Sequence, residues 1–318
     1  MTLLLALACS PHPTSKTPAT NDSTATTTDS ADSAGDTGGP VNPYALAAEV
    51  DQATLLADIT SLQDFGTRYS GTTGNDDARA WIEDQLTATG LDTEEDPFAA
   101  GINVIARKPG TTHPERIWVF SAHYDDTSEQ PQTLAPGADD NGSGVATVLS
   151  AARILGPHAF EDTIWFVTMG AEEQGSLGSA HLAQVMNDDG LDVQGVIAPD
   201  MMAYWPLQDG DAFDILGDDA SAGMVSNMAD IADHLGVANK MWIEHHYCEG
   251  DDHTSFQDAG IPAMSPMDCV EAHNVPSSGE TVPYYHTSGD VVDTLYLPFT
   301  ARVAQVIVAS LASWAEPS

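Results

Sequence analysis

The chain has 318 residues, 42% of them hydrophobic, which is enough for one large α/β domain with a full core. Its 48 acidic residues against 9 Lys and Arg give a net charge of −39, which argues against nucleic acid and anionic membrane surfaces as partners. No stretch approaches the ~20 consecutive apolar residues that cross a bilayer. Contact with a membrane is therefore expected only through a lipid anchor.

The N-terminus carries an export pattern. Thr2–Ala8 is a short apolar run that ends in A-L-A-C at Cys9, which is typical of a bacterial lipoprotein signal with Cys9 as the lipidated residue. No Lys or Arg precedes the run, and an ordinary cleaved secretion signal is the alternative. After Cys9, the segment up to residue 42 is rich in Ser, Thr, Pro and Asp and predicts a disordered tether. We therefore expect a signal at 1–8, a lipidated tether at 9–42 and one domain at 43–318. The protein is expected to be exported, either lipid-anchored at the cell surface or outer membrane, or secreted.

Apolar periodicity begins at about Pro43. Helical patterns cover residues 44–65, 75–88, 143–155, 175–187, 220–235 and 297–314. Strand-like runs lie between several of them, at Ile102–Ala106, Ile117–Ser121, Thr163–Thr168, Val196–Ala198, Ala212–Leu216, Met241–Glu244 and Ile261–Met264. This alternation predicts a single α/β domain with a mixed, mostly parallel central sheet and helices on both faces.

Imidazole and carboxylate side chains follow two of these strands. His123 comes after R-I-W-V-F-S-A, and Asp125, two residues on, can orient a metal-bound imidazole. Glu172 and Glu173 follow T-I-W-F-V-T-M, and adjacent residues of an extended chain point to opposite sides. One of the pair can therefore ligate a metal while the other reaches a metal-bound water. A structural histidine and a solvated acidic pair are the alternatives.

Further candidates lie in loops. Asp139 and Asp140 stand in A-P-G-A-D-D-N-G-S-G, where one carboxylate can bridge two metals, or where the pair can cap the next helix. Asp200 closes G-V-I-A-P-D, His286 lies in P-Y-Y-H-T-S-G-D, and His253 in G-D-D-H-T-S-F. Together with the strand-end residues they supply the ligands of a two-metal site.

The motif order H-x-D, G-A-D-D-x-x-S-G, A-E-E-x-G-x-x-G-S, strand-D-M, D-D-H and H-T-x-x-D resembles the secreted bacterial two-zinc aminopeptidases of clan MH. These leucyl-aminopeptidase-like enzymes have a zinc-exopeptidase fold (phosphorylase/hydrolase-like) and share a superfamily with glutaminyl cyclases and the transferrin-receptor ectodomain. The similarity runs from about Ser61 (S-L-Q-D-F-G-T-R-Y-S-G) through N-V-I-A-R-K-P-G-T to the final helix.

The resemblance implies a role for each matching residue. The implied metal ligands are Asp139 as the bridge, Glu173 and His286 at one metal, and His123 and Asp200 at the other. Glu172 would be the general base and Asp125 the partner of His123. Asp140 would follow Asp139 across a cis peptide bond, and Asp252 and His253 would have no ligand role.

The substrate pocket and the cysteines transfer less directly. Tyr247 lies near the D-D-H motif, where relatives often place an oxyanion-stabilising tyrosine, but its spacing does not align. Met201, Tyr285 and Met264 are candidates for the pocket, and each suits the core equally well. The tight disulfide of some relatives is absent. Cys248 and Cys269, an even pair in an exported protein, are expected to form a disulfide, with two free thiols as the alternative.

The expected function is a metallo-aminopeptidase that removes the first residue from peptides with a free N-terminus. Two Zn²⁺ are the expected cofactors, although other divalent metals suit the same N and O ligands. Acidic clusters such as Asp218–Asp219 are compatible with Ca²⁺, but a solvated acidic face explains them equally. Glutaminyl cyclase and a non-catalytic surface-binding module are the alternatives, and a monomer is expected.

Overall fold

The structure is a computed structural model that describes residues 41–204, 212–245, 251–267 and 284–318. Contacts within the chain divide it into two units, Met1–Gly38 and Gly39–Ser318, and every described residue belongs to the second. The expected signal, the Cys9 anchor and nearly all of the tether lie outside the described residues. Tyr247, Cys248 and Cys269 also lie outside them, so the disulfide stays a prediction.

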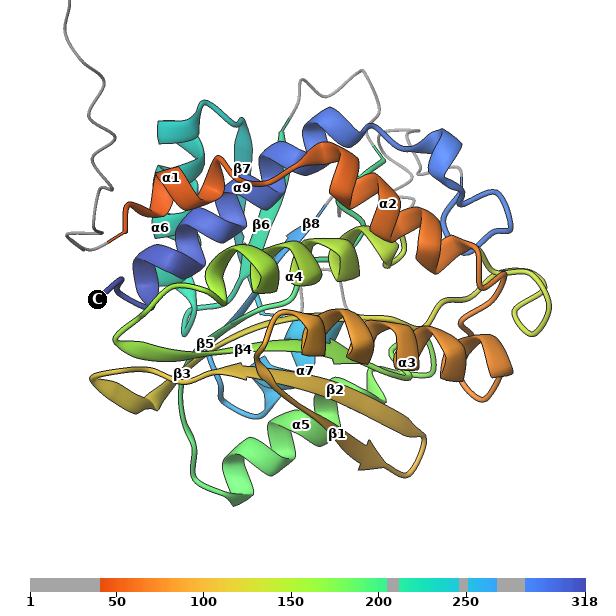
Figure 1. Ribbon diagram of the computed structural model, residues 1–318, viewed down its shortest axis with the longest axis horizontal. Coiled ribbons are helices and arrows are strands. Elements are labelled where there is room, and N and C mark those ends of the chain that lie inside the picture. Colours follow the sequence, from red (N-terminus) through yellow and green to blue (C-terminus); the bar gives the residue numbers. More distant parts are fainter. Residues whose placement is uncertain (1–40, 205–211, 246–250, 268–283) are drawn as a thin grey trace, which may run out of the picture. The chain divides into compact units, whose positions relative to one another are not determined.

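The described residues form an eight-stranded sheet in the order β1-β2-β4-β3-β5-β8-β6-β7 (Figure 1). The strands are β1 (Asp92–Phe98), β2 (Gly101–Lys108), β3 (His113–His123), β4 (Asp162–Met169), β5 (Asp192–Ile197), β6 (Phe213–Gly217), β7 (Asn239–Ile243) and β8 (Ala263–Met267). The four central strands, β4, β3, β5 and β8, pair in parallel, so their carboxyl ends meet at one edge of the sheet. β2 and β6 pair antiparallel on either side of them.

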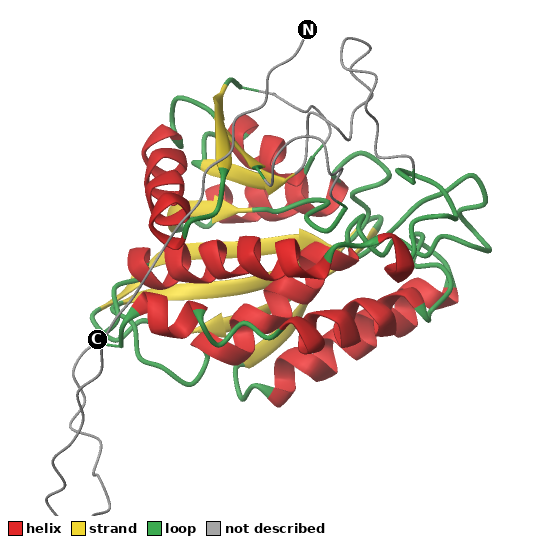
Figure 2. Ribbon diagram, turned by 90° about the horizontal axis from the view of Figure 1, so that it is seen from above, coloured by secondary structure: helices red, strands yellow, loops and turns green. Residues whose placement is uncertain are grey.

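Helices cover both faces of this sheet, and Figure 2 shows the strands between them. The helices are α1 (Pro43–Ala47), α2 (Gln52–Gln63), α3 (Thr73–Ala88), α4 (Gly142–Leu155), α5 (Leu177–Asp188), α6 (Ala222–Leu235), α7 (Asp252–Asp258), the short 3-10 helix η1 (Val292–Thr294) and α9 (Leu297–Trp314). In β3, Phe120 packs into the core with α4 and α9, whereas Val119 packs into a second cluster with α5 and α7. This alternation follows from the two-residue period of a strand. It confirms the predicted single α/β domain with a mixed, mostly parallel sheet.

Helix α9 contributes to the larger core. By length and composition alone it could cross a membrane, but 67% of it is buried within the protein. Val303, Ile307 and Leu311 are fully buried in the cluster that also contains α1, α2 and α4. It is therefore a core helix.

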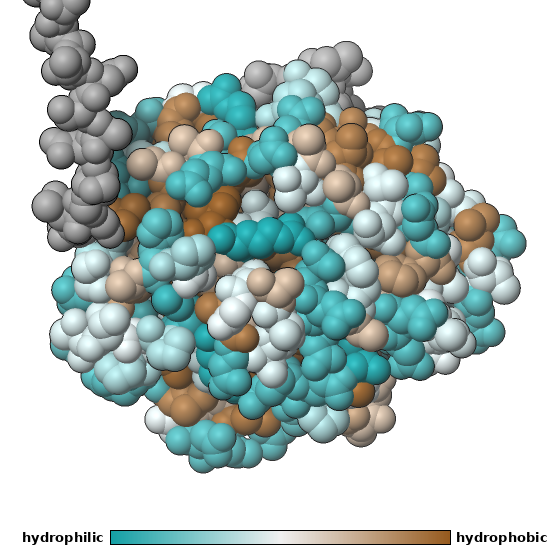
Figure 3. Space-filling model, viewed as in Figure 1, coloured by the Kyte–Doolittle hydropathy of each residue, from teal (hydrophilic) through white to brown (hydrophobic). Residues whose placement is uncertain are grey.

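On the face shown in Figure 3, hydrophilic residues surround small separate apolar areas.

One predicted helix differs from the structure, and strand β1 and helix α7 have no counterpart among the predicted elements. The helix expected over 44–65 is broken, because the Asp51 carboxylate accepts the N–H of Thr54 and begins a new helix, α2. Strand β1 was not predicted, since D-T-E-E-D-P-F is an acidic edge strand with little apolar alternation. Helix α7 was not predicted either, because its D-H-T-S-F-Q-D sequence is short and polar.

Candidate metal centre at the carboxyl edge of the sheet

His123 ends β3 and its side chain is almost fully buried. Its Nε2 atom lies 3.3 Å from Oδ2 of Asp200, which stands three residues after β5. The same nitrogen is 3.4 Å from Oδ1 of Asp140, in the loop before α4. Parallel pairing of β3 with β5 brings His123 and Asp200 together, because the carboxyl ends of both strands lie at one edge of the sheet.

Asp140 belongs to two groups of potential ligands. Its Oδ1 faces His123 and Asp200, while its Oδ2 lies 3.4 Å from Nε2 of His286. His286 Nε2 is also 3.1 Å from Oε2 of Glu173. Within each group, the candidate ligand atoms lie within 4.8 Å of one another. The structure therefore brings His123, Glu173, Asp200 and His286 together as predicted, with one carboxylate between the two pairs.

That central carboxylate is Asp140, and the expectation that Asp139 bridges is wrong. The Asp139 carboxylate accepts the backbone N–H groups of Ala203 at 2.7 Å and Tyr204 at 2.8 Å, and it belongs to neither ligand group among the described residues. The cis peptide bond also follows Asp140, where it joins Asn141, and not Asp139. Two adjacent aspartates face different directions, and the D-D spacing alone did not indicate which one reaches the histidines.

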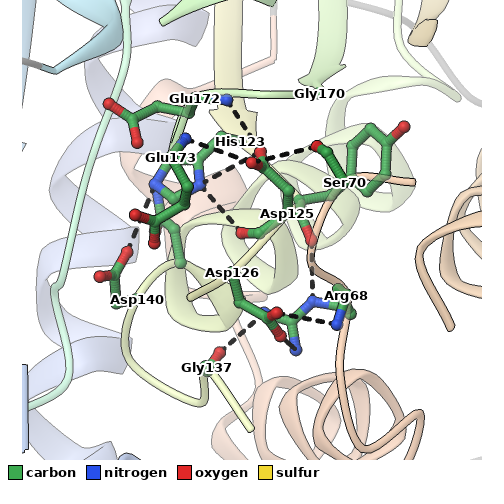
Figure 4. A network of polar contacts seen from close by, with 12 residues as sticks. Arg68, Ser70, His123, Asp125, Asp126, Gly137, Asp140, Gly170, Glu172 and Glu173 are labelled. Atoms are coloured by element: carbon green, nitrogen blue, oxygen red, sulfur yellow. Dashed lines mark hydrogen bonds and ion pairs between the residues drawn. The ribbon is translucent and has the colours of Figure 1, made fainter. Parts of the chain in front are cut away.

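Asp125 has further contacts besides the expected one with His123. His123 Nδ1 lies 3.1 Å from the backbone carbonyl of Asp125 and 3.8 Å from its carboxylate. The carboxylate instead accepts the N–H of Glu172 at 3.0 Å and the N–H of Glu173 at 3.2 Å (Figure 4). Ser70 Oγ lies 3.4 Å from the same group. Asp125 therefore fixes the backbone of the Glu172–Glu173 pair as well as contacting His123.

The two glutamates differ in their contacts. The Glu173 side chain is buried and faces His286, and its Oε1 atom has no hydrogen-bond partner among the described residues. Burial, and then the Asp140 charge, raise the pKa of Glu173 to about 8. Glu172 lies apart from both ligand groups, and its Oε1 accepts a hydrogen bond from Ser176 Oγ. Burial also raises the pKa of Glu172 well above its usual value.

The pKa values of the two histidines are raised by the carboxylates around them. Burial lowers the pKa of His286, but hydrogen bonds to Asp140 and Glu173 raise it to about 10. Burial opposes and Asp200 favours protonation of His123, whose pKa ends well above its usual value. The raised pKa values of both histidines and of Glu173 show that this cluster of carboxylates favours added positive charge, which a divalent cation would also supply. Imidazole nitrogens, carboxylate oxygens and the unsatisfied Glu173 Oε1 fit zinc, which takes N and O ligands at such sites.

A buried ion pair between Arg68 and Asp126 lies next to the candidate metal centre. Arg68 donates to the carbonyls of Tyr124 at 2.8 Å, Pro136 at 2.9 Å and Gly137 at 2.9 Å, and its Nη1 lies 3.2 Å from Asp126 (Figure 4). Gly137 has a φ of 51°, and a Cβ there would meet Arg68 Nη2 at 2.7 Å. Glycine is therefore required at this position. The motif S-L-Q-D-F-G-T-R-Y-S-G contains Arg68 but did not indicate its role.

The candidate pocket residues separate into two sets. Met201 is buried and packs in a small apolar cluster with Leu216, and Tyr285 packs against that cluster. The Tyr285 ring stacks on the ring of His286 with centroids 3.7 Å apart, so Tyr285 borders the ligand groups. Met264 lies in the main apolar core, and Tyr247 lies outside the described residues. His253 is buried on α7 and belongs to neither ligand group among the described residues.

Asp290 is a site residue to which sequence analysis gave no role. Its buried carboxylate accepts the N–H of Asp139 at 2.9 Å and the N–H of Asp140 at 3.0 Å. It closes the H-T-x-x-D motif four residues after His286. The motif was the available signal, but the motif alone does not say which backbone groups a carboxylate contacts.

Comparison with known proteins identifies the family. Residues 103–311 match Peptidase family M28, which spans β2 to α9 and every candidate ligand described above. The chain therefore belongs to peptidase family M28, a family of zinc metallopeptidases.

Individual relatives are distant. The chain is 28% identical over 334 aligned positions to a probable zinc metalloprotease of Pyrenophora tritici-repentis, covering 86% of this chain and 68% of that one. The fold is similar to the LapA aminopeptidase of Legionella pneumophila, with a TM-score of 0.73 at 22% identity, covering 86% and 74% of the two chains. It is also similar to the glutaminyl cyclase of Porphyromonas gingivalis, with a TM-score of 0.66 at 21% identity, covering 83% and 98%.

Proposed function

We propose that this protein is a zinc-dependent aminopeptidase that removes the N-terminal residue from peptides. The observation that carries the proposal is the position of Asp140, whose two carboxylate oxygens face two different histidines. A carboxylate shared between two N/O ligand pairs is what a pair of metals held by one bridge requires. His123 and Asp200 would complete one site, and Glu173 and His286 the other.

The chemistry follows from the side chains around this bridge. Zinc bound here would supply a water of lowered pKa and polarise the scissile carbonyl. Glu172 would take up the proton from that water and return it to the leaving amine. Its raised pKa supports this role, because a buried carboxyl group can hold a proton near neutral pH. Asp125 would keep Glu172 in place through the N–H bond at 3.0 Å.

The acidic surroundings favour a substrate with a free amino terminus. Asp251 and Asp252 are buried, and burial is the largest cause that raises the pKa of each, with the Asp200 charge acting in the same direction. An excess of carboxylates attracts the ammonium group of a peptide N-terminus and positions the first peptide bond at the bridge. The LapA aminopeptidase, which has a similar fold, is consistent with exopeptidase activity.

The test uses two short peptides, one that begins with Leu and one that begins with Gln. The zinc-loaded protein is incubated with each, with and without a chelator, and the products are weighed. We expect loss of the N-terminal residue and no loss in the chelated sample. Loss of ammonia alone from the Gln peptide would instead identify a cyclase, and unchanged peptides would contradict both catalytic assignments.

A matched pair of variants tests the assigned base. Glu172→Gln should retain zinc but lose about 10²- to 10⁴-fold in turnover, the usual contribution of a general base. Glu115→Gln makes the same chemical change at an exposed position near the other end of β3 and should behave like the unaltered protein. Near-normal turnover of Glu172→Gln would show that another group moves the proton.

A further inference from the structure

We infer that Asp290 is the positioning residue that fixes the shared carboxylate of Asp140 relative to His286. This role rests on the metal-binding function proposed above. Asp290 itself contacts neither histidine in the two ligand groups, and it acts through the backbone of the residues that do the binding.

Three consecutive backbone N–H groups of the loop before α4 donate hydrogen bonds to Asp290. The Asp290 carboxylate accepts Asp139 N–H on Oδ1 at 2.9 Å and Asp140 N–H on Oδ2 at 3.0 Å. The Asp290 backbone carbonyl accepts the N–H of Ala138 at 3.2 Å. The carboxylate is buried, so water does not compete for these bonds. The backbone at Asp140 is therefore held by a segment 150 residues further along the chain.

The segment that supplies Asp290 also supplies His286. Thr287 N–H donates to Tyr284, and Asp290 N–H donates to Thr287 at 3.2 Å, so the turn is bonded internally. His286 has a φ of 54°, a left-handed conformation that non-glycine residues adopt only when their surroundings hold them. The rigid turn thus carries one ligand directly and holds a second, Asp140, through its main chain.

Asp139 extends the same arrangement to a third segment. Its N–H is bound by Asp290, and its own carboxylate accepts the N–H groups of Ala203 and Tyr204. These two residues follow Asp200, which faces His123. Loops that carry His286, Asp140 and Asp200 are therefore joined by aspartates that each accept two adjacent amides. This arrangement explains why the D-D motif contains one aspartate that is not a ligand.

Replacing the Asp290 carboxylate by an amide tests whether Asp290 positions the loop through its hydrogen bonds or only fills space. Asp290→Asn keeps the shape, but its NH₂ group faces the N–H of either Asp139 or Asp140, so one acceptor becomes a donor. Asp293→Asn is the matched control, because Asp293 is exposed, lies three residues away and loses the same charge. Zinc affinity is measured by competition with a chelating dye, and amide hydrogen exchange by mass spectrometry.

We expect Asp290→Asn to bind zinc about 10- to 100-fold more weakly, the usual effect of removing a group that orients a metal ligand. Exchange should accelerate in the peptide that contains Asp139 and Asp140, while Asp293→Asn matches the unaltered protein in both measurements. A folded Asp290→Asn with unaltered zinc affinity and unaltered exchange in this peptide would overturn the inference.

A measurement on the unaltered protein covers the case in which Asp290→Asn does not fold. Binding energy coupled between two segments is reciprocal, so zinc should slow amide exchange at residues 138–140 and in the turn of Asp290. Exchange at 138–140 that does not respond to zinc would overturn the inference. Peptide cleavage is scored separately: a protein that binds zinc as expected but cleaves no peptide contradicts the proposed function and leaves the positioning result standing. A protein that binds no zinc contradicts both.

Discussion

His123 ends the parallel strand β3, and Glu172 and Glu173 follow its neighbour β4, whereas Asp140 and His286 stand in loops between elements. In the first region, strand register places the side chains: His123 pairs with Met169, so the residues after β4 emerge beside it. The second region has no ladder to set its register. It relies on side chains that accept backbone N–H groups, such as Asp290 at Asp139 and Asp140.

The two regions nevertheless use the same device to hold adjacent acidic residues. Asp125 accepts the N–H groups of Glu172 and Glu173, as Asp290 accepts those of Asp139 and Asp140. At the strand ends this bond refines a position already set by the sheet. In the loops it sets the position itself. Changes to Asp290 are therefore expected to act on metal binding, and changes to Asp125 on turnover.

The largest expected effect separates the two adjacent aspartates of the loop region. Asp140→Asn removes the charge shared by the two ligand pairs and should lower turnover by about 10³-fold or more, because a two-metal site contributes several kcal/mol to catalysis. Asp139→Asn disturbs the bonds to Ala203 and Tyr204 and should weaken zinc binding by about 10- to 100-fold. Zinc content and turnover of the purified variants measure both. If Asp139→Asn lost more zinc and more turnover than Asp140→Asn, Asp139 and not Asp140 would be the bridging carboxylate.

The next effect concerns the strand-end region. Asp125→Asn turns an amide donor toward Glu172 or Glu173 N–H and should lower kcat by about 10- to 100-fold, with a smaller change in KM. Asp126→Asn is the adjacent comparison, because Asp126 pairs with buried Arg68 instead. Breaking a buried pair should cost about 3–5 kcal/mol of unfolding free energy. Steady-state kinetics and denaturant titration distinguish the two, and equal effects on stability would show that Asp125 is only structural.

The strand-end half of the site was predictable because apolar strands and the polar residues after them are visible as a pattern. The R-I-W-V-F-S-A and T-I-W-F-V-T-M runs placed His123, Glu172 and Glu173 correctly at one edge. The same logic placed the central sheet and α9, whose predicted bounds 297–314 match the structure.

The loop half was not predictable to the residue. Choosing between Asp139 and Asp140 depends on where Ala203 and Tyr204 lie, and those residues are 64 and 65 positions away from Asp139. Asp290 likewise acts at a distance of 150 residues from Asp140. Motif spacing identifies such residues as a set, but backbone hydrogen bonds between distant loops assign their roles.

The smallest expected effect is a pH dependence that zinc removes. Asp139 and Glu173 have pKa values raised by burial to about 7 and about 8, and His286 is raised to about 10 by its carboxylate neighbours. Between about pH 6 and pH 8.5 the folded metal-free chain therefore binds more protons than the unfolded chain, so its stability falls as pH rises. The pKa of Asp140 is lowered by His286 and His123 against the effect of burial, but that shift lies below this window.

Exposed carboxylates are already ionised throughout this range, so the self-repulsion of the acidic surface stays nearly constant. We expect the Tm of chelated protein to fall by about 5 °C or more across it, since each kcal/mol lost lowers Tm by about 2–4 °C for a domain of this size. Zinc should reverse the trend, because metal binding displaces the same protons and strengthens with pH. Circular dichroism melts with chelator or with zinc measure both slopes. A chelated Tm that rises with pH would show that the ligands of the loop and strand-end regions do not share protons as the structure indicates.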